Sequence, residues 1–307
     1  MMSFNTPIPY NKPPIGRIKG AKSMIEVFTK LDIVENIDKE VVNAFGEEWT
    51  KFTNYNSESI NQLGNAIFKN IDERIVNKDT YMIDIGCGSG RWSTHFVDKA
   101  GFIESVDPSD AVYVADNILS DNSNVRVTKA SVSTLPWSDE TFDFGMSIGV
   151  LHHIPDTKQA LIDCVKKIKR GGYFYVYLYY RFDDRGVLFK AVFYLTNLVR
   201  LVISRMPEKL KKITCDILAV VIYWPVSRFA GLLKKLGFRS LANKIPLEPY
   251  SNRPLYSLRN DSLDRFGTKL EQRFLRSEIE AMMVEAGLTD IQFREDIPKW
   301  HALGRKK

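Results

Sequence analysis

The chain has 307 residues, 44% of them hydrophobic and 26% charged, with a formal net charge of +6 at pH 7. This length is sufficient to bury a sizeable core, and the composition is that of an ordinary soluble globular protein. The three cysteines are scattered without metal-ligand spacing, which argues against a disulfide framework and against a zinc site. They are Cys87, Cys164 and Cys215.

The N-terminal part of the chain is expected to lie outside the main domain. Residues 1–20 are rich in proline and asparagine and predict a flexible arm. They lack the apolar core of a secretory signal, so we expect a cytoplasmic protein. Residues 21–78 predict a mainly helical extension, in which Phe45, Trp49 and Phe52 recur at helical spacing. Packing is the simplest interpretation of these aromatics, and a lid over a ligand site is the alternative.

The next hundred residues alternate between two patterns. Strands are expected at 81–85, 102–106, 125–128, 142–148 and 173–179, and helices at 92–99, 111–119 and 158–168. Strands that alternate with helices of this length predict a parallel sheet covered on both faces.

The alternation stops in a helical insertion at residues 181–274 and then resumes. A helix is expected at 277–286, with a Ser277–Glu280 capping box and Gly287 as its C-cap. Strands at 290–294 and 300–303 follow, the second antiparallel. The expected fold is a Rossmann-like, doubly wound, mostly parallel seven-stranded sheet, whose core comprises residues 79–180 and 275–307.

The stretch "DIGCGSG", from Asp84 to Gly90, is a glycine-rich turn after the first predicted strand of this sheet. Its spacing differs from the dinucleotide fingerprint G-x-G-x-x-G, and no Gly-Lys-Ser/Thr follows, which excludes a P-loop. Asp84 precedes the glycines, and Asp107 lies about twenty residues downstream, where a carboxylate binds ribose hydroxyls. Both acids suit a nucleoside with a positively charged, phosphate-free tail, such as S-adenosylmethionine.

Four ordered stretches resemble a known family. "DIGCGSG", "VDPS", "LPWSDETFDFGMSIGVLHHI" and "KRGGYFYV" resemble the successive motifs of class I S-adenosylmethionine-dependent methyltransferases, of the branch that includes ubiquinone-biosynthesis enzymes. The resemblance covers about residues 80–179 and resumes in the last thirty residues. It implies S-adenosylmethionine as the cofactor.

The resemblance also implies roles for matching residues. The glycine turn would hold the methionine part of the cofactor, with Cys87 as a small residue in a tight space. Asp107 would bind the ribose, while Pro108 and Ser109 would flank the adenine. Ser131 stands where the family often has a carboxylate, so the adenine contact would fall to Ser131 and the backbone of Val132. The implied cofactor-binding positions are Asp84, Gly86, Cys87, Gly88, Gly90, Asp107, Pro108, Ser131, Val132, Ile148 and Leu151.

Two neighbouring histidines are the candidates for a catalytic base. A hydroxyl acceptor must lose its proton, and histidine suits that task at neutral pH. His152 and His153 follow the fourth predicted strand of the core and lie at the catalytic edge of the sheet. The resemblance makes this pair common in the family, where it is often structural, and that alternative stays open. No clustered histidines and carboxylates suggest a metal, so we expect none.

The insertion is expected to determine what is methylated. Residues 187–204 predict an amphipathic helix, and the apolar run 217–226 is too short to span a bilayer and is expected to end at Pro225. The region 187–233 fits a packed cap, a homodimer contact, a substrate tunnel or a peripheral membrane patch. Further on, a loop dense in aromatic and basic groups predicts either acceptor-binding side chains or a salt-bridged structural segment. Its candidate acceptor residues are Tyr250, Arg253, Tyr256 and Arg259.

The predicted function is therefore methylation of a small, hydrophobic or lipid-like acceptor, at a hydroxyl in the first instance, with N- and C-methylation open. An RNA methyltransferase is an alternative that the positive charge favours, but no RNA-binding appendage is recognisable, so no nucleic-acid partner is expected. A cofactor-binding protein without chemistry is a further alternative, which the intact Asp84 and Asp107 argue against. An NAD-dependent oxidoreductase fits least.

Overall fold

A computed structural model describes residues 6–32, 36–51, 57–182, 186–245, 247–295 and 300–307. The chain divides into two compact units. The core unit comprises Met1–Asp183 and Leu270–Lys307, and the insertion unit comprises Asp184–Lys269. The predicted insertion, 181–274, was a few residues longer at each end.

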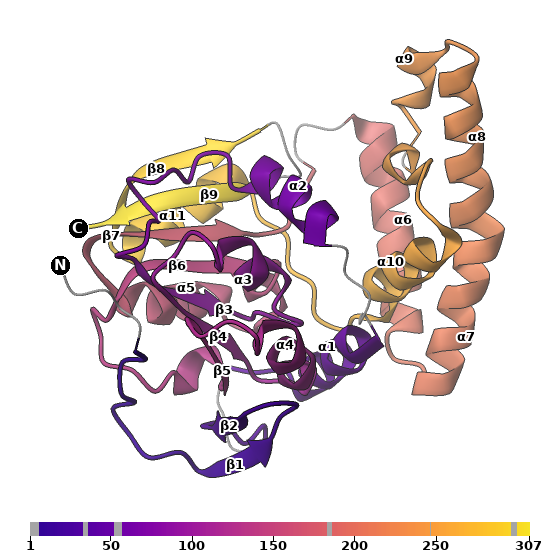
Figure 1. Cartoon of the computed structure of the whole chain (residues 1–307). Helices are drawn as coiled ribbons and strands as arrows, with labels where there is room; N and C mark the ends of the chain where they lie inside the picture. The colour runs from indigo at the N-terminus through magenta and orange to yellow at the C-terminus, as the bar shows by residue number, and fades with distance from the viewer. Residues whose placement is uncertain (1–5, 33–35, 52–56, 183–185, 246, 296–299) are drawn as a thin grey trace. The chain divides into compact units, whose positions relative to one another are not determined.

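The core unit is built on one mixed sheet of nine strands (Figure 1). Their order is β1-β2-β5-β4-β3-β6-β7-β9-β8, and β2 through β7 pair in parallel. The strands are β1 (Gly16–Lys19), β2 (Met24–Val27), β3 (Tyr81–Ile85), β4 (Phe102–Asp107), β5 (Val125–Lys129), β6 (Phe142–Ile148), β7 (Ile168–Tyr177), β8 (Leu288–Arg294) and β9 (His301–Lys306). The predicted fold class is confirmed, and β9 pairs antiparallel with both neighbours. The strand count of seven was wrong because the N-terminal segment adds two.

The N-terminal segment is ordered against the sheet, in contrast to the predicted flexible arm and helix. Strands β1 and β2 form an antiparallel pair, and β2 extends the sheet beside β5. Before them, the Ile8 backbone N–H donates to the Tyr81 hydroxyl, and the Tyr10 ring packs against Trp137 at a centroid distance of 5.3 Å. Apolar contact with the core therefore fixes residues whose proline-rich composition predicted disorder.

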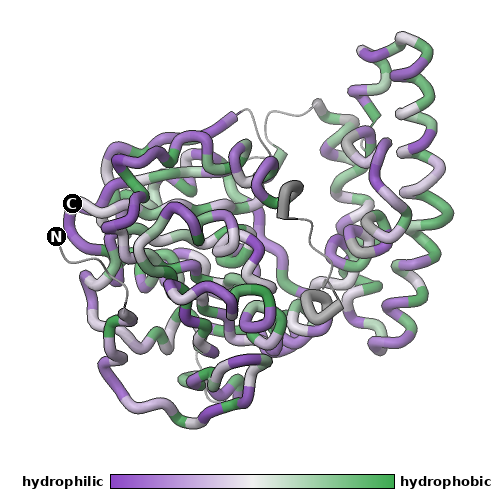
Figure 2. The backbone as a smooth tube through the Cα atoms, viewed as in Figure 1, coloured by the Kyte–Doolittle hydropathy of each residue, from purple (hydrophilic) through white to green (hydrophobic). Residues whose placement is uncertain are grey.

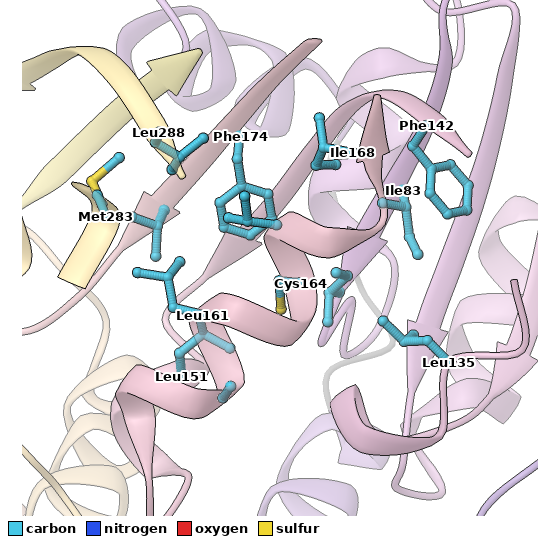
Figure 3. Close-up of a cluster of buried hydrophobic side chains, with 14 of the residues drawn as sticks. Ile83, Leu135, Phe142, Leu151, Leu161, Cys164, Ile168, Phe174, Met283 and Leu288 are labelled. Carbon is cyan, nitrogen blue, oxygen red and sulfur yellow. The ribbon is translucent and has the colours of Figure 1, made fainter. Parts of the chain in front are cut away.

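Helices cover both faces of the sheet because successive strand residues point to opposite sides. Ile83 belongs to the cluster packed on α5 (Thr157–Lys166) and α11 (Arg276–Glu285), part of which Figure 3 shows. Its neighbour Met82 belongs to the opposite cluster, packed on α2 (Ser57–Ile67) and α3 (Arg91–Phe96). Helix α4 (Ala111–Leu119) buries its apolar face against β2 and β5.

The last helix starts differently from the expectation. Glu278, rather than Glu280, reaches back to the N-terminus of α11, where it accepts from the Leu275 backbone N–H at 2.7 Å. The helix begins at Arg276, so Ser277 lies in its first turn and the predicted Ser277–Glu280 box is wrong. The C-cap of α11 is Ala286, one residue before the predicted Gly287, and Gly287 follows it with φ +93°, the left-handed conformation that ends helices.

Helix α1 (Lys39–Lys51) occupies the region where a helix with aromatic residues was predicted. Asp38 begins it, because its carboxylate accepts from the Val41 backbone N–H at 3.1 Å. Phe45 lies on this helix, whereas the predictions for Phe52 and for the Trp49 side chain fall outside the described part of the chain.

Helices joined by short turns make up the described residues of the insertion unit. It contains α6 (Val187–Ile203), α7 (Glu208–Leu218), the π-helical turn η3 (Ala219–Tyr223), α8 (Trp224–Lys235), α9 (Arg239–Ala242), η4 (Glu248–Tyr250) and α10 (Leu255–Gly267). Ile203, Cys215 and Phe266 form its small buried centre.

The segments α7, η3 and α8 form one continuous helix, Glu208–Lys235, so the prediction that the apolar run ends at Pro225 was wrong. The reason is the π turn. The Trp224 backbone N–H donates to the Ala219 carbonyl, five residues back, and Pro225 then occupies the first turn of α8. Proline has no N–H, so the ladder of helical hydrogen bonds is interrupted at Pro225, directly after the π turn, and the helix continues beyond it as α8.

Candidate active site

A cavity in the core unit opens at the carboxyl ends of β3, β4, β5 and β6. Strand β3 lies between β4 and β6, so the order of strands reverses at this point, which is where ligands bind in doubly wound sheets. Ten of the predicted cofactor-binding and catalytic residues line the cavity: Gly86, Cys87, Gly88, Asp107, Pro108, Ser109, Ser131, Val132, Ile148 and His153. Asp84, Gly90, Leu151 and His152 do not line it.

The glycine turn bends the chain across the cavity floor. The N–H groups of Gly86 and Cys87 both donate to the Val106 carbonyl, at 2.7 and 2.9 Å. Gly86 has φ +78°, and a Cβ there would come within 2.4 Å of the Val150 side chain. Glycine at this position is therefore required both by backbone conformation and by the approach of Val150.

Asp107 is the acid at the end of β4, and its carboxylate is held by the glycine turn. One oxygen accepts from the Gly88 N–H at 2.9 Å, and the other accepts from the Ser109 N–H at 2.8 Å and hydroxyl at 2.6 Å. Burial raises the pKa of Asp107 above its ordinary value, and these hydrogen bonds oppose that rise. Each carboxylate oxygen has two lone pairs, so the oxygen bonded to Gly88 retains acceptor capacity for a ligand hydroxyl.

Asp84 lies behind the turn and is 1% exposed. Its carboxylate accepts from the Ser93 hydroxyl at 2.7 Å, and Ser93 is also 2.7 Å from the Ser105 hydroxyl. Burial raises the pKa of Asp84 to about 7, and the nearby Asp107 adds to the rise. The structure therefore places Asp84 where it joins β3 to α3 and supports the glycine turn.

Cys87 lines the cavity as a thiol rather than a thiolate. Burial raises its pKa well above the ordinary value, and Asp107 and Asp84 act in the same direction. Since the thiolate is the nucleophilic form of cysteine, this environment agrees with the interpretation of Cys87 as a small space-filling residue.

Ser131 begins the short helix η1 (Val132–Thr134) at the end of β5. Its hydroxyl lies 3.2 Å from the Ser133 hydroxyl and 3.0 Å from that of Thr134. These contacts orient the Ser131 side chain at the cavity wall.

Helix α1 supplies a wall of the cavity that sequence reasoning mostly missed. Its apolar residues Val41, Val42 and Phe45 face the site, together with Asn36, Ile37 and Asp38 before it. The helix packs closely on the loop after β4, where a Cβ on Gly46 would lie 3.1 Å from Ser109 Cβ. The helical recurrence of Val41, Val42 and Phe45 was visible in the sequence, but nothing there showed which surface this face covers.

Asn36 fixes the start of this covering segment. Its amide donates to the Asp156 carbonyl at 3.0 Å, and its oxygen accepts from the Asp156 N–H at 2.6 Å. Asp156 in turn caps α5 by accepting from the Gln159 N–H at 2.9 Å. The segment before α1, which lines the cavity, is thus attached to the loop that follows the two histidines.

His153 lies on the short helix η2 (Leu151–His153) and faces the cavity. Its Nδ1 is 2.7 Å from the Leu270 carbonyl oxygen, and its ring is 4.8 Å from that of Phe45. A carbonyl oxygen only accepts, so Nδ1 carries the proton and Nε2 has the lone pair in the neutral imidazole.

His152 has a different environment from its neighbour. It is fully buried and stacks on Tyr179 at 3.9 Å between ring centroids. Neither ring nitrogen has a hydrogen-bond partner among the described residues. Burial lowers its pKa well below the ordinary value, so this imidazole is neutral. The two histidines are adjacent, but only His153 reaches the cavity.

The four residues predicted to bind the acceptor belong to the insertion unit. Arg259 forms a two-pronged ion pair with Asp216, at 2.8 and 2.5 Å. Arg253 lies 3.6 Å from Asp261 and 4.9 Å from the centre of the Tyr250 ring, and Tyr256 is 52% exposed. These contacts account for Arg253 and Arg259 as stabilising groups within their unit.

Comparison with known proteins agrees with the geometry. Residues 83–176 match the methyltransferase domain family. The chain is 25% identical over 143 residues to a ubiquinone biosynthesis O-methyltransferase of Coxiella burnetii, covering 45% of this chain and 61% of the relative. A protein of the same description from Rhizobium etli is 28% identical over 121 residues, covering 39% and 48%. The matched segments span less than two thirds of the length of these relatives.

Solved structures with weaker likeness include human N-acetylserotonin methyltransferase in complex with SAM. It has a TM-score of 0.47 and 15% identity and covers 85% of this chain and 56% of its own. A possible histamine N-methyltransferase of Thermotoga maritima has a TM-score of 0.45 and 15% identity and covers 87% and 99%.

The family match, the strand order and the acidic glycine-turn site define the class: the core of this chain is a class I S-adenosylmethionine-dependent methyltransferase domain. Within that class, part of the chain is similar in sequence to ubiquinone biosynthesis O-methyltransferases.

The residues present fit the cofactor. The Asp107 carboxylate suits ribose hydroxyls, the glycine turn leaves room for the methionine part, and Val132 and Ile148 offer apolar walls. S-adenosylmethionine supplies an activated methyl group when bound, and the residues of the chain bind and orient it.

Proposed function

We propose that the protein transfers the methyl group of S-adenosylmethionine to a hydroxyl of a small, hydrophobic or lipid-like acceptor. The observation that carries the proposal is the state of His153. Its Nδ1–H is bound to the Leu270 carbonyl, so in the neutral imidazole the lone pair lies on Nε2, at a residue that lines the cofactor cavity. A positioned neutral imidazole is the group that removes a hydroxyl proton at neutral pH.

The walls around His153 support the hydrophobic character of the acceptor. Phe45 packs beside its ring, and Val41 and Ile154 line the same cavity. Such a lining excludes water from the acceptor hydroxyl, and apolar contact would hold an alkyl or aromatic body in place. The similarity to ubiquinone-biosynthesis O-methyltransferases, although limited to part of the chain, favours the same acceptor class.

The acceptor atom is tested with three matched compounds. A phenol, an aniline and a thiophenol that carry the same isoprenoid tail are incubated with the full chain and methyl-labelled cofactor. The proposal expects label in the phenol at least tenfold faster than in the aniline. Native cell extract is assayed in parallel, and label confined to amines, carbon, RNA or protein contradicts the proposal.

The variant His153→Asn distinguishes a role of His153 as catalytic base from a role in holding the fold together. The asparagine amide occupies the region of Nδ1 and keeps a donor for the Leu270 carbonyl, but it supplies no basic nitrogen. Loss of a general base is expected to lower kcat by about 10²-fold or more, while the Kd for the cofactor stays within threefold. His95→Asn, outside the cavity, is the control for losing a buried histidine. Unchanged kcat in His153→Asn would show that another group takes the proton.

A further inference from the structure

The long helix Glu208–Lys235 of the insertion unit leaves its apolar residues in solvent. Leu210, Ile213, Ile217, Val221, Trp224 and Phe229, here called the apolar stripe, recur every three to five residues and are each between 43% and 64% exposed. The opposite face is buried, with Cys215, Ala219 and Ala230 at 0% to 1% exposure. Figure 2 shows hydrophobic and hydrophilic residues alternating along this helix. Exposed apolar surface of this extent marks an interaction site.

The charge of the insertion unit indicates what this surface meets. Residues 184–269 contain 16 Lys and Arg against six Asp and Glu, a net charge of +10, so the remainder of the chain carries −4 within the total of +6. Lys209, Lys211 and Lys212 stand at the beginning of the helix, and Lys234 and Lys235 at its end. A partner that offers both apolar contact and negative charge complements this arrangement, whereas a second copy with the same +10 is repelled.

By length and composition the helix would also qualify as a membrane span, and only 17% of its most apolar window is buried. Two charged residues within it, Asp216 and Arg228, argue against a helix that crosses the bilayer. The uncharged stretch between Asp216 and Arg228 has eleven residues, 217–227. At about 1.5 Å per residue it is about 17 Å long, against about 30 Å for the hydrocarbon core of a bilayer.

Those two charges are also tied to the rest of the unit. Asp216 is bound to Arg259, and the Arg228 guanidinium donates to the Ser251 carbonyl at 2.6 Å and the Arg253 carbonyl at 2.9 Å. The helix is therefore fixed with the face that carries Cys215, Ala219 and Ala230 on its own unit and with the apolar stripe outward. That geometry suits a helix lying in the plane of a membrane surface.

We propose that the insertion unit docks the protein on an anionic phospholipid bilayer. The apolar stripe enters the interface between headgroups and acyl chains, with Trp224 at the level where aromatic residues are favoured, and the lysines at both ends of the helix bind lipid phosphates. This inference concerns the insertion unit and stands independently of the acceptor proposed above.

The test is vesicle flotation with the full chain. Phosphatidylcholine vesicles containing about 30% phosphatidylglycerol are compared with pure phosphatidylcholine vesicles, at low and high salt. We expect at least tenfold tighter binding to the anionic vesicles, weakened by salt because the lysine contribution is screened.

Two sets of variants separate the apolar and the electrostatic contributions. Val221→Asp with Phe229→Asp places charge in the apolar stripe and is expected to abolish flotation. The matched control, Ser240→Asp with Asn243→Asp, adds the same charge at exposed polar positions outside the stripe and is expected to bind more tightly than the stripe variant by tenfold or more. Lys209→Glu with Lys235→Glu should lower anionic-vesicle affinity at least tenfold and weaken its salt dependence. Cofactor Kd and circular dichroism check that each variant is folded.

Three outcomes overturn the proposal. One is failure of the folded wild-type protein to float with anionic vesicles. Another is equal loss of binding in the stripe variant and its matched control. The last is a dimer, detected by analytical ultracentrifugation, that the stripe variant dissociates while vesicle binding is absent, since a second copy would then cover the stripe.

Discussion

The core unit and the insertion unit use the same kinds of side chain in opposite ways. The core unit buries charged groups and satisfies them: Glu104, fully buried, accepts two hydrogen bonds from Arg126 at 2.9 and 2.6 Å and one from the Tyr81 hydroxyl. The insertion unit exposes apolar groups, with Val221 64% accessible, and keeps its ion pairs at the surface. The charged groups of the core unit are therefore fixed by hydrogen bonds inside the fold, whereas the apolar groups of the insertion unit remain at its surface.

The largest effect is expected at Asp107, the acid proposed to bind the ribose. Asp107→Ala removes the acceptor for Gly88 and Ser109 and the proposed acceptor for the ribose hydroxyls. Hydrogen bonds to a charged group contribute about 1.5–3 kcal/mol each, so the Kd for S-adenosylmethionine should rise more than about 100-fold in calorimetry. Asp110→Ala is the matched control, because that acid pairs with Lys129 at the surface. Equal affinities in the wild type and Asp107→Ala would refute the ribose assignment.

A pH-dependent effect is expected from Asp84. Its pKa rises from 3.8 to about 7 in the folded protein. Between these values the native state holds a proton that the unfolded chain has lost, so this group makes the protein less stable as pH rises toward 7. Asp84→Asn removes that dependence, and between pH 5 and pH 8 the variant should gain about 2 to 3 kcal/mol of unfolding free energy relative to wild type.

Urea unfolding at the two pH values measures this difference. Asp110→Asn, which makes the same substitution at the surface, is measured beside it as the control. Parallel stability curves for Asp84→Asn and wild type would mean that Asp84 is ionised in the folded protein.

A smaller effect is expected at Asn36, which attaches the segment before α1 to Asp156. Asn36→Ala removes both hydrogen bonds to Asp156 and loosens the segment before α1. This loss is expected to cost about 1 kcal/mol of cofactor-binding free energy, so the Kd for S-adenosylmethionine should rise about fivefold. Asn122→Ala, which removes a side-chain bond to the Leu119 carbonyl away from the cavity, is the control. If both variants bind the cofactor equally well, α1 contributes nothing to holding it.

The smallest effect is expected at the surface of the insertion unit. The Arg259–Asp216 ion pair is exposed on both sides, so a double-mutant cycle to alanine should give a coupling energy below about 1 kcal/mol. The same variants distinguish the two interpretations of Arg259. A structural role leaves the KM for the acceptor unchanged, whereas a raised KM would support the acceptor-binding role predicted from the sequence.

The alternating part of the chain was predictable because its periodicity reflects burial. Strands β3 and β6 and helix α4 were predicted with the bounds that the structure has, since both faces of the sheet are covered and the apolar runs end at turn residues. The glycine spacing and the two acids predicted a phosphate-free ligand because no phosphate-binding signature is present, and the structure brings Gly86, Gly88 and Asp107 together at one cavity.

The rest depended on contacts distant in sequence. Strands β1 and β2 are stabilised by pairing with β5 and by the packing of Tyr10, which no local pattern reveals. The two adjacent histidines differ in environment because His153 contacts the Leu270 carbonyl whereas His152 stacks on Tyr179. The passage of the long helix through Pro225 depends on a π turn, a rare conformation that propensity disfavours.

The ordered N-terminal segment also protects the sheet from its neighbours in solution. Strand β5, with the sequence "VRVTK", would be an open edge without β2, and unpaired edges template pairing between molecules. The outermost strand is instead β1, a short one that carries Arg17 and Lys19, charges that discourage such pairing. A chain shortened to begin after residue 28 would keep every cofactor-binding position and still become prone to aggregation, so the first residues are a solubility element of the fold.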